Sequence, residues 1–594
     1  MAAHRNFTEL AHERITALAE REAYVCVRDD QQGGLESDVL SYGELGESAR
    51  RLASWLQRSG SHGHRVLILQ SDVRQFMSSF LGCLYAGAVA VPAPVPAGSR
   101  QNVERVAGIV RDASVSYILT DAAMASAVSQ LLAEMGHTEV ATLATDRFSG
   151  GDPDAWEEPG LFPDDVAFLQ YTSGSVSDPK GVMVTHRNLL ANQQSIQRAM
   201  RTSQESRVGG WLPFHHDMGL VGHLLHPLWL GACGVLMPPM TFVKRPLRWL
   251  QMVDRHGITT GGGPNLAYDL CLRRIKDDQI AELDLSRWET AVNGAEPVRA
   301  ETMEAFAERF APAGFRREAF YPCYGLAEAT LLATGGDVGE PAAMRLVDAG
   351  ELEQHRLRPA ELGQPERRLV SCGRPQGCEV AVVDPDTGRR LPAGQVGEVW
   401  LRGESIARGY WNRPLENAHA FHAVTEDGDE GYLRTGDLGA LAGGELYVTG
   451  RIKDIMIVAG RNLYPQDIER SVQRISALFG SSAAFAVESG RDHVVVVQEV
   501  RTGSCFEAEL AQLSAAVRTC VAQEFEVAAE NVLLVRPGTV RRTTSGKLQR
   551  TAMRRLFLDG RIQPLYEELH PEVRALVTTG AMSGEGATSG GAAG

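Results

Sequence analysis

Short β-prone runs alternate with amphipathic helical stretches in the first part of the chain, and this alternation limits the folds that are possible. Strands are predicted at 65–69, 88–92 and 116–120, and helices at about 71–86, 101–112 and 122–135. A helix that connects two strands returns the chain to the end of the sheet where the first strand began, so the two strands run parallel. The sequence therefore predicts an α/β fold with parallel sheets, preceded by a mainly helical segment over residues 5–58.

The rest of the chain falls into segments of different character. Residues 218–240 predict a buried helix followed by a core strand, and short strands at 380–383, 397–401 and 445–448 predict a β-rich subdomain over about 369–450. After residue 460 the pattern is mixed again, with a strand at 494–500 and a helix at 506–525. Since 594 residues exceed what one hydrophobic core usually serves, we expect a large N-terminal domain over 1–452 and a small α+β C-terminal domain over 453–574. The Gly/Ala/Ser-rich tail over 575–594 is expected to be disordered.

Composition and charge exclude several classes of protein. The net charge of −15 argues against a nucleic-acid binder, which normally carries a basic stripe. The N-terminus lacks the apolar core of a signal peptide. Residues 218–240 are interrupted by histidines, glycines and Pro227, whereas a spanning helix needs ~20 cleaner apolar residues. Together with nine irregularly spaced cysteines, which read as reduced thiols, these features predict a cytoplasmic protein without stable membrane insertion.

The run YTSGSVSDPKG, residues 171–181, is a candidate phosphate-binding loop. It follows an apolar stretch and precedes a β-prone run, and it is rich in hydroxyls and small residues. Hydroxyls and backbone amides can surround phosphate oxygens, and a lysine supplies a positive charge. Neither the Walker order nor a G-x-G-x-x-G turn occurs here, and a polar hairpin loop is the alternative for the motif alone. The candidate phosphate ligands are Thr172, Ser173, Gly174, Ser175 and Lys180.

Four further segments carry chemistry that suits a nucleotide. YPCYGLAEAT places an aromatic ring, Tyr324, close to a carboxylate, Glu328, which can hold Mg²⁺ through oxygen. YLRTGDLG places Asp437 in a turn where it can accept hydrogen bonds from ribose hydroxyls. TGRIKDIMIVAGRNLYPQDIE combines basic and acidic residues before a strand, and RRTTSGKLQR carries Lys547 on a Ser-Gly-Lys turn. Each segment alone could be an ordinary turn or charged loop.

In this order, from about residue 10 to 570, the motifs resemble the adenylate-forming superfamily of acyl-CoA synthetases, luciferases and adenylation domains. Within it the chain looks most like the fatty acyl-AMP ligases. The segments LPFHHDMGL and GRNLYPQDIE resemble the sequence motifs of that branch. The long connection over about 335–368 resembles the insertion that the branch carries. One departure is that Val176-Ser177 stands where the family loop most often has Thr-Gly.

The resemblance implies that ATP and a fatty acid give acyl-adenylate and pyrophosphate. Lys547 would bridge the carboxylate and the α-phosphate, His216 would lie beside the carboxylate, and Glu328 would hold Mg²⁺. Lys453 would be the hinge of the C-terminal domain. The implied ATP-binding residues, besides the phosphate loop, are Gly294, Ala295, Glu296, Tyr324, Gly325, Asp437 and Arg451. The expected lining of the acyl pocket includes Trp211, Phe214, Gly263 and Tyr268.

Several alternatives remain open at this level. The expected acceptor is the phosphopantetheine thiol of a separate acyl carrier protein, or of a carrier domain in a polyketide or peptide synthetase, serving lipid, polyketide or lipopeptide biosynthesis. A fatty acyl-CoA synthetase would share the catalytic residues, and an amino-acid adenylation enzyme or an inactive scaffold would share the fold. A zinc site is a further alternative for the local cluster of His215, His216, His223 and His226, although it lacks the usual Cys or carboxylate ligands.

Overall fold

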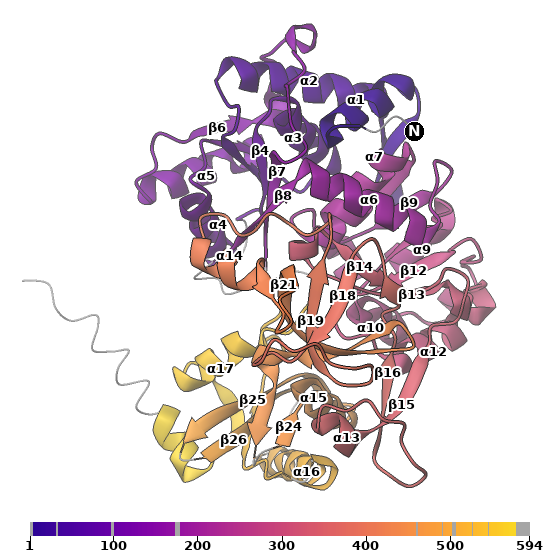
Figure 1. Cartoon of the computed structure of the whole chain (residues 1–594), viewed down its shortest axis with the longest axis vertical. Helices are drawn as coiled ribbons and strands as arrows, with labels where there is room; N and C mark the ends of the chain where they lie inside the picture. The colour runs from indigo at the N-terminus through magenta and orange to yellow at the C-terminus, as the bar shows by residue number, and fades with distance from the viewer. Residues whose placement is uncertain are drawn as a thin grey trace, which may run out of the picture.

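The computed structural model describes residues 4–30, 34–96, 100–172, 179–458, 461–489, 491–501, 507–525, 527–543 and 546–577. Figure 1 shows the N-terminal elements at the top, a β-rich layer in the middle and the C-terminal elements, coloured yellow, at the bottom. No helix among the described residues is both long and apolar enough to cross a membrane.

The first parallel sheet confirms the predicted alternation of strands and helices. Its order is β6-β5-β3-β4-β7-β8, and its pairs are parallel except β7 with β8. The strands are β3 (Arg65–Leu69), β4 (Val89–Pro92), β5 (Tyr117–Thr120), β6 (Ala141–Ala144), β7 (Val166–Tyr171) and β8 (Gly181–Thr185). The connecting helices are α3 (Val73–Tyr85), α4 (Arg100–Ala113) and α5 (Ala122–Glu134).

The helical prediction for residues 5–58 is wrong in its middle part. The segment forms α1 (Phe7–Ala17), β1 (Glu22–Asp29), β2 (Leu35–Ser41) and α2 (Tyr42–Arg58). The run Ala23–Val27 is buried and pairs in parallel with β10 (Cys233–Leu236), so long-range sheet pairing decides its conformation. The expected periodicity holds for α2, which begins with a capping box between Ser41 and Glu44.

The second sheet brings several motif-bearing loops to one edge. Its order is β17-β14-β13-β12-β11-β9-β10-β1-β2, with a parallel centre. The central strands are β9 (Arg207–Gly210), β11 (Thr260–Gly263), β12 (Thr290–Asn293) and β13 (Phe320–Gly325), and β14 (Leu332–Gly335) and β17 (Arg374–Pro375) complete one side. Ligands bind beyond the carboxyl ends of parallel strands in open α/β sheets. The segments that follow β9, β12 and β13 carry His216, Glu296 and Glu328.

Helices cover the second sheet and fill the connections between its strands. They are α6 (His186–Met200), α7 (His226–Leu230), α8 (Pro239–Lys244), α9 (Leu247–Arg255), α10 (Asn265–Arg274), α11 (Asp277–Ile280) and α12 (Ala300–Phe310). Residues Met218–Leu225 form a π-helical segment that continues into α7, and β10 follows. This confirms the buried helix and core strand predicted over 218–240.

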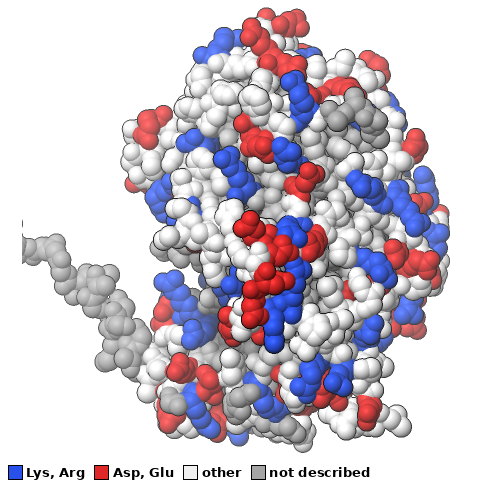
Figure 2. Space-filling model, viewed as in Figure 1, with Lys and Arg blue, Asp and Glu red and all other residues white. Residues whose placement is uncertain are grey.

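The β-rich region is also confirmed. A five-stranded sheet contains β18 (Glu379–Val383), β19 (Gly397–Arg402), β20 (Ala423–Val424), β21 (Glu430–Ala442) and β22 (Glu445–Arg451). The long connection over 335–368 contributes β15 (Met344–Asp348), α13 (Ala349–Glu353) and the start of β16 (Glu366–Val370). Figure 2 shows a dense group of acidic and basic side chains in the middle of this face. Within the β-rich region, Arg402 pairs with Glu379 at 2.6 Å and Arg390 pairs with Asp429. These charges of the β-rich region are therefore compensated locally.

The C-terminal region forms a sheet of its own, in the order β25-β26-β27-β28. Its elements are β23 (Met456–Val458), β24 (Arg461–Leu463), α15 (Pro465–Arg474), β25 (Phe479–Ser489), β26 (Arg491–Val500), α16 (Glu507–Phe525), β27 (Asn531–Val535), α17 (Arg550–Leu558) and β28 (Pro564–Glu568). Ile468 and Val472, one turn apart on α15, pack with Val494 and Val496 of β26. Residues 571–577 are helical, which corrects the predicted start of the tail at 575; residues 578–594 lie outside the described part of the chain.

Candidate active site

A cavity of about 1750 Å³ lies between the N-terminal regions and the C-terminal domain. Most of the described residues that the sequence singled out contribute to its wall: Thr172, Lys180, His216, Ala295, Glu296, Tyr324, Gly325, Glu328, Asp437, Arg451, Lys453 and Lys547. Gly294 lines a smaller cavity of about 60 Å³, which shares Lys547, Ala295, Tyr324 and Gly325 with the large one. Ser173, Gly174 and Ser175 lie outside the described residues.

Asp437 is a buried carboxylate at the centre of a triad in this wall, between buried Tyr324 and exposed Arg451. It lies on β21, opposite Arg451 in the register with β22, and is 5% exposed. The Tyr324 hydroxyl donates to Asp437 Oδ2 at 2.8 Å, and Arg451 Nε lies 2.8 Å from Oδ1. The negative charge of Asp437 raises the pKa of Arg451. Each carboxylate oxygen keeps a further lone pair, so Asp437 can still accept hydrogen bonds from a ligand.

A second group connects the end of the phosphate loop to Glu328. Lys180 Nζ forms an ion pair with Glu416 on α14 (Pro414–Ala420) and lies 5.3 Å from the centre of the Tyr410 ring. The Tyr410 hydroxyl donates to Glu328 Oε1 at 2.7 Å. Burial and the nearby Glu328 raise the pKa of Tyr410, which keeps its hydroxyl a donor. Sequence reasoning missed Tyr410 and Glu416, because they lie 82 and 236 residues from their partners and no local spacing reports the contact.

Lys547 comes from the C-terminal domain and lies in both cavities. The turn that carries it is closed by hydrogen bonds between Thr543 and Lys547 in both directions: Thr543 N donates to the Lys547 carbonyl at 2.8 Å, and Lys547 N donates to Thr543 Oγ1 at 3.0 Å. Burial lowers the pKa of Lys547, while the charge of Asp217 acts in the opposite direction. The ammonium is therefore held in a poorly solvated place and attracted by carboxylates, which suits an anionic ligand.

Asp217 and His216 form a close pair beside this lysine. His216 Nδ1 lies 2.7 Å from Asp217 Oδ1, and Asp217 also accepts from the backbone N–H of Met218 at 2.7 Å, where the π-helical segment begins. Burial alone would raise the pKa of Asp217, but the neighbouring His216 and Lys547 outweigh it and lower that pKa to about 2. Asp217 is thus ionised at neutral pH and provides a fixed negative charge near Lys547.

The turn after β12 is conformationally unusual. Ala295 has a φ of +68°, in the left-handed region that non-glycine residues seldom occupy. At Gly294 a Cβ would lie 2.9 Å from Cys323 Sγ, so the chain passes close to β13 here. Glu296 Oε1 accepts from the backbone N–H of Leu266 at 2.8 Å, and burial raises the pKa of Glu296. Such backbone conformations concentrate at binding sites, and this turn lies in the wall of both cavities.

Lys453 lies where the chain leaves the β-rich sheet. It is an exposed residue of the turn Ile452–Asp454, directly after β22. The next residue, Asp454, pairs with Arg550 at 2.8 Å, and Arg550 also pairs with Glu469 at 2.7 Å. The C-terminal domain is therefore tied together immediately beyond Lys453, which is the arrangement expected at a junction between two rigid parts.

The predicted acyl-pocket residues line neither of these two cavities. Trp211 stacks on Phe242 with ring centres 4.0 Å apart, and the Tyr268 hydroxyl donates to the Val292 carbonyl at 2.7 Å. Phe214 packs against Phe76, and a Cβ at Gly263 would lie 3.2 Å from Trp211. The smaller cavity is lined instead by a mainly apolar set that includes Ile196, Met200, Val208, Met218, Val292, Leu331 and Leu332, together with His223 and His226. The apolar residues in the sequence indicated buried positions, but they did not show whether a side chain lines a cavity or packs against other side chains.

The histidines of residues 215–226 do not form a metal cluster in the described structure. Among described residues, one group of three or more His, Cys, Asp or Glu ligand atoms converges within 4.8 Å, and it lies in the C-terminal domain. His226 is held by Gln193 at 2.6 Å and Thr202 at 2.8 Å. Burial lowers the pKa of His223 to about 4 and that of His226 to about 3, so both are neutral.

Comparison with known proteins matches the chain over both domains. Residues 12–411 match the family described as AMP-binding enzyme, and residues 453–566 match the AMP domain of Disco-interacting protein 2-like proteins. The chain is 43% identical over 542 residues to medium-chain-fatty-acid–[acyl-carrier-protein] ligase JamA of Moorena producens, covering 89% of this chain and 92% of that protein. The corresponding ligase TtuA of Teredinibacter turnerae is 33% identical over 602 residues, covering 92% and 93%.

Solved structures give the same result. The crystal structure of a fatty acyl-adenylate ligase from L. pneumophila, in complex with acyl adenylate and pyrophosphate, superimposes with a TM-score of 0.73 at 36% identity. The superposition covers 94% of this chain and 97% of the L. pneumophila chain, so the similarity extends over the motif-bearing regions and the C-terminal domain alike.

Proposed function

The chain belongs to the fatty acyl-AMP ligases of the adenylate-forming enzyme superfamily and has their fold, and on this basis we propose that it activates a medium- or long-chain fatty acid with ATP. The products are an acyl-adenylate and pyrophosphate, and the acyl group then passes to the phosphopantetheine thiol of an acyl carrier protein. The observation that carries the proposal is that Lys547 of the C-terminal domain shares one cavity with the Tyr324–Asp437–Arg451 triad and the His216–Asp217 pair.

The first half-reaction joins two anions, so charge neutralisation and alignment are what the protein must supply. A carboxylate oxygen forms a bond to the α-phosphorus as the bond to pyrophosphate breaks. We assign Lys547 to contact both reacting groups, His216 to lie beside the carboxylate, and Lys180 with Thr172 to contact the departing phosphates. In the second half-reaction the thiol sulfur loses its proton and attacks the acyl carbon, and AMP leaves.

Asp437 and the turn at Ala295 are assigned to the nucleoside. Asp437 accepts hydrogen bonds from the ribose hydroxyls, on the lone pairs that Tyr324 and Arg451 leave available. The adenine lies between the Tyr324 face of the cavity and the backbone of Gly294, Ala295 and Glu296. Because Tyr324 is already bound to Asp437, the two halves of the nucleoside site are positioned relative to each other before ATP binds.

Glu328 fits the requirement for Mg²⁺ bound to ATP. It is a cavity-lining carboxylate, and the hydrogen bond from Tyr410 occupies Oε1 and leaves Oε2 for a cation. Mg²⁺ prefers such hard oxygen ligands and keeps several waters and phosphate oxygens. When bound, it supplies positive charge against the phosphates, while Tyr410 orients the carboxylate that holds it.

The acceptor is assigned to a carrier protein because the two carrier-protein ligases reported above resemble the chain over both domains. The insertion over 335–368 also contacts the C-terminal domain. Arg461 forms ion pairs to both oxygens of Glu353 at 2.8 and 3.0 Å, and Asn462 donates to the Glu353 carbonyl at 3.0 Å. Lys453, between the β-rich sheet and these residues, is assigned as the pivot of the C-terminal domain. Free coenzyme A is the alternative acceptor.

A two-part assay tests the proposal. Lys547→Ala is expected to reduce pyrophosphate release by about 10²–10³-fold, the loss typical of one removed transition-state donor. Lys244→Ala, an exposed lysine on α8 outside the cavity wall, is the matched control and should retain the wild-type rate. With the wild-type protein, holo-carrier protein should become acylated while coenzyme A is a poor acceptor. Unchanged pyrophosphate release by Lys547→Ala would refute the assigned mechanism, and efficient acyl-CoA formation would favour the coenzyme A alternative.

A further inference from the structure

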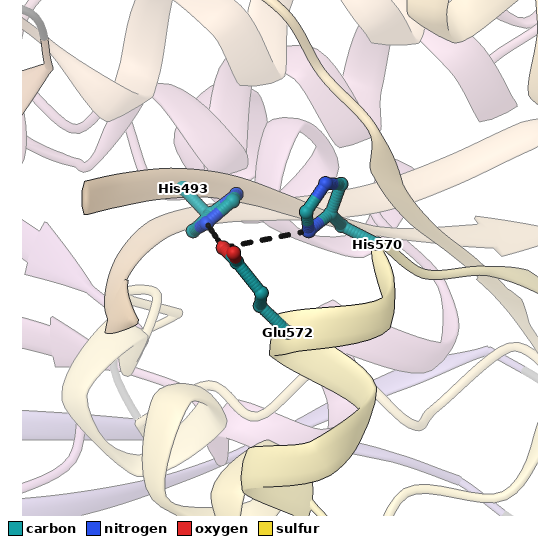
Figure 3. Close-up of side chains that lie close together, drawn as sticks. All are labelled: His493, His570 and Glu572. Carbon is teal, nitrogen blue, oxygen red and sulfur yellow. Dashed lines mark hydrogen bonds and ion pairs between the residues drawn. The ribbon is translucent and has the colours of Figure 1, made fainter. Parts of the chain in front are cut away.

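We propose that His493, His570 and Glu572 form a zinc-type metal site in the C-terminal domain, separate from the catalytic cavity. His493 lies on β26, His570 follows β28, and Glu572 lies in the first turn of the helix over 571–577. Figure 3 shows both imidazole rings directed toward the Glu572 carboxylate, which lies between them. None of the three residues lines the 1750 Å³ cavity, so the site is independent of the proposed function.

The distances suit a small tetrahedral ion. One ligand atom from each residue lies within 4.8 Å of the others. His493 Nε2 is 3.3 Å from Glu572 Oε2, and His570 Nδ1 is 3.7 Å from the same oxygen. In a tetrahedral zinc site with bonds of about 2.0–2.2 Å, neighbouring ligand atoms lie roughly 3.3–3.6 Å apart. The three atoms therefore need only small movements to reach bonding distance of one ion.

The nitrogen that would bind the metal lacks another role. His570 Nδ1 is buried and makes no hydrogen bond within the described part of the chain. A buried polar atom without a partner is costly, and it calls for an explanation such as an ion or a water molecule. His493 is 4% exposed, and its ring lies 5.0 Å from that of His570. Two imidazoles, one of them buried, therefore share the exposed carboxylate of Glu572, an arrangement that a divalent cation satisfies better than a single hydrogen bond does.

A further carboxylate lies near the other nitrogen of His570. His570 Nε2 points toward Glu530 at 4.0 Å, and Glu530 is held by Arg491 at 3.0 Å. Metal-ligating histidines usually direct their other nitrogen at a carboxylate, which fixes the tautomer. A His₂Glu set with an open fourth position is typical of zinc, and imidazole ligands disfavour Mg²⁺ and Ca²⁺. Binding would join β26 to the helix over 571–577 and so anchor the end of the described chain.

Zinc titration of the full-length, chelator-treated protein tests the site. We expect one equivalent of Zn²⁺ to bind with micromolar or tighter affinity by calorimetry, and the melting temperature to rise with Zn²⁺ but not with equal Mg²⁺. Co²⁺ in place of Zn²⁺ should give the intense visible absorption of a four-coordinate ion. The adenylation rate at 25 °C should be the same with and without zinc, because the site lies outside the catalytic cavity.

Matched variants give the decisive comparison. His570→Ala and Glu572→Gln should each weaken Zn²⁺ binding at least about 10-fold. His137→Ala is the control, since His137 and Glu139 form a surface pair 3.4 Å apart that lies outside the three-residue cluster. Zinc binding that survives in both site variants, or a wild-type protein that binds no Zn²⁺ below about 100 μM, would overturn the proposal.

Discussion

Gly546 provides a test of whether the position of Lys547 depends on contact with the N-terminal domain. Its backbone has a φ of +90°, and a Cβ added there would lie 2.4 Å from Leu266 Cδ2. Leu266 belongs to α10, at the end of β11, whereas Gly546 belongs to the turn of the C-terminal domain that carries Lys547. The substitution Gly546→Ala therefore has two separate effects, one on the turn itself and one on the contact between domains.

The two effects differ in size and in where they act. An alanine in the left-handed region costs about 1–2 kcal/mol wherever the turn is folded, so this part reduces the stability of the C-terminal domain in every orientation. The clash acts only while the turn lies against Leu266. Moving the δ-methyl off its rotamer costs about 1 kcal/mol, and displacing the turn instead costs up to about 3 kcal/mol. At 1.36 kcal/mol per tenfold change in rate, adenylation should slow roughly 5- to 150-fold.

Measuring the two half-reactions separately distinguishes these effects. Pyrophosphate release in a single turnover should fall by the amount above, while acyl transfer from a prepared acyl-adenylate to holo-carrier protein should change less than about threefold. The double variant Gly546→Ala/Leu266→Ala should recover most of the adenylation rate, because the clashing methyl is gone.

Gly538→Ala is the matched control for this experiment. Gly538 also lies in the C-terminal domain with a φ of +85°, but a Cβ there meets nothing within 4 Å. It should lower the melting temperature and leave adenylation unchanged. The reasoning is refuted if Gly538→Ala slows adenylation as much as Gly546→Ala, or if Leu266→Ala gives no recovery.

Two further predictions concern charge in the cavity. Burial lowers the pKa of Lys547, so kcat/KM for adenylation should fall as pH rises through a value below the ~10.4 of a free lysine. Lys547→Arg should abolish this fall at alkaline pH. If the fall persists in the variant, it belongs to another group. The same shift makes the Lys547 contribution to stability increase with pH between its folded and unfolded pKa, because the unfolded chain binds more protons there. Tyr410→Phe keeps the ring beside Lys180 and removes the hydroxyl that orients Glu328. The Mg²⁺ concentration for half-maximal rate should rise about 10–100-fold, and an unchanged requirement would show that Tyr410 does not orient a magnesium ligand.

The parts of the fold that depend on local pattern could be predicted from the sequence. The helix–strand alternation gave the first parallel sheet, and turn residues gave the β-rich region. The strand β1 was missed because its conformation is decided by pairing with β10, about 200 residues later in the chain. The acyl-pocket assignment stays a prediction, because its residues line neither of the two cavities described above. Trp211 and Tyr268 are apolar and buried as expected, but burial alone does not say whether a side chain faces a cavity or another side chain.

The site was predictable to the extent that each residue stood in its own motif. Tyr324 and Asp437 were singled out separately and both line the large cavity, yet their hydrogen bond spans 113 residues and only the tertiary structure brings it about. The partners Tyr410 and Glu416 stand outside any motif, and their importance comes only from what they contact. Residue type and spacing therefore indicated the chemistry, while the relative placement of the groups depends on the packing of separate sheets.

The contacts of the C-terminal domain also bear on how the two half-reactions alternate. In the described structure Lys547 lies in the cavity, and eight residues after Lys453 the guanidinium of Arg461 binds both oxygens of Glu353 in the insertion. On the proposed rotation about Lys453, Lys547 must leave the cavity and the Arg461–Glu353 ion pair must break, because Lys547 and Arg461 both move with the C-terminal domain. The side chains of Glu353 and Arg461 are 17% and 31% exposed, so their ion pair is partly shielded from solvent, and it forms only in this orientation of the domain. On the proposed function, the insertion therefore favours the orientation in which Lys547 contributes to adenylation, and acyl transfer would require this preference to be overcome. Binding of the carrier protein would do so only through contacts made in the rotated orientation.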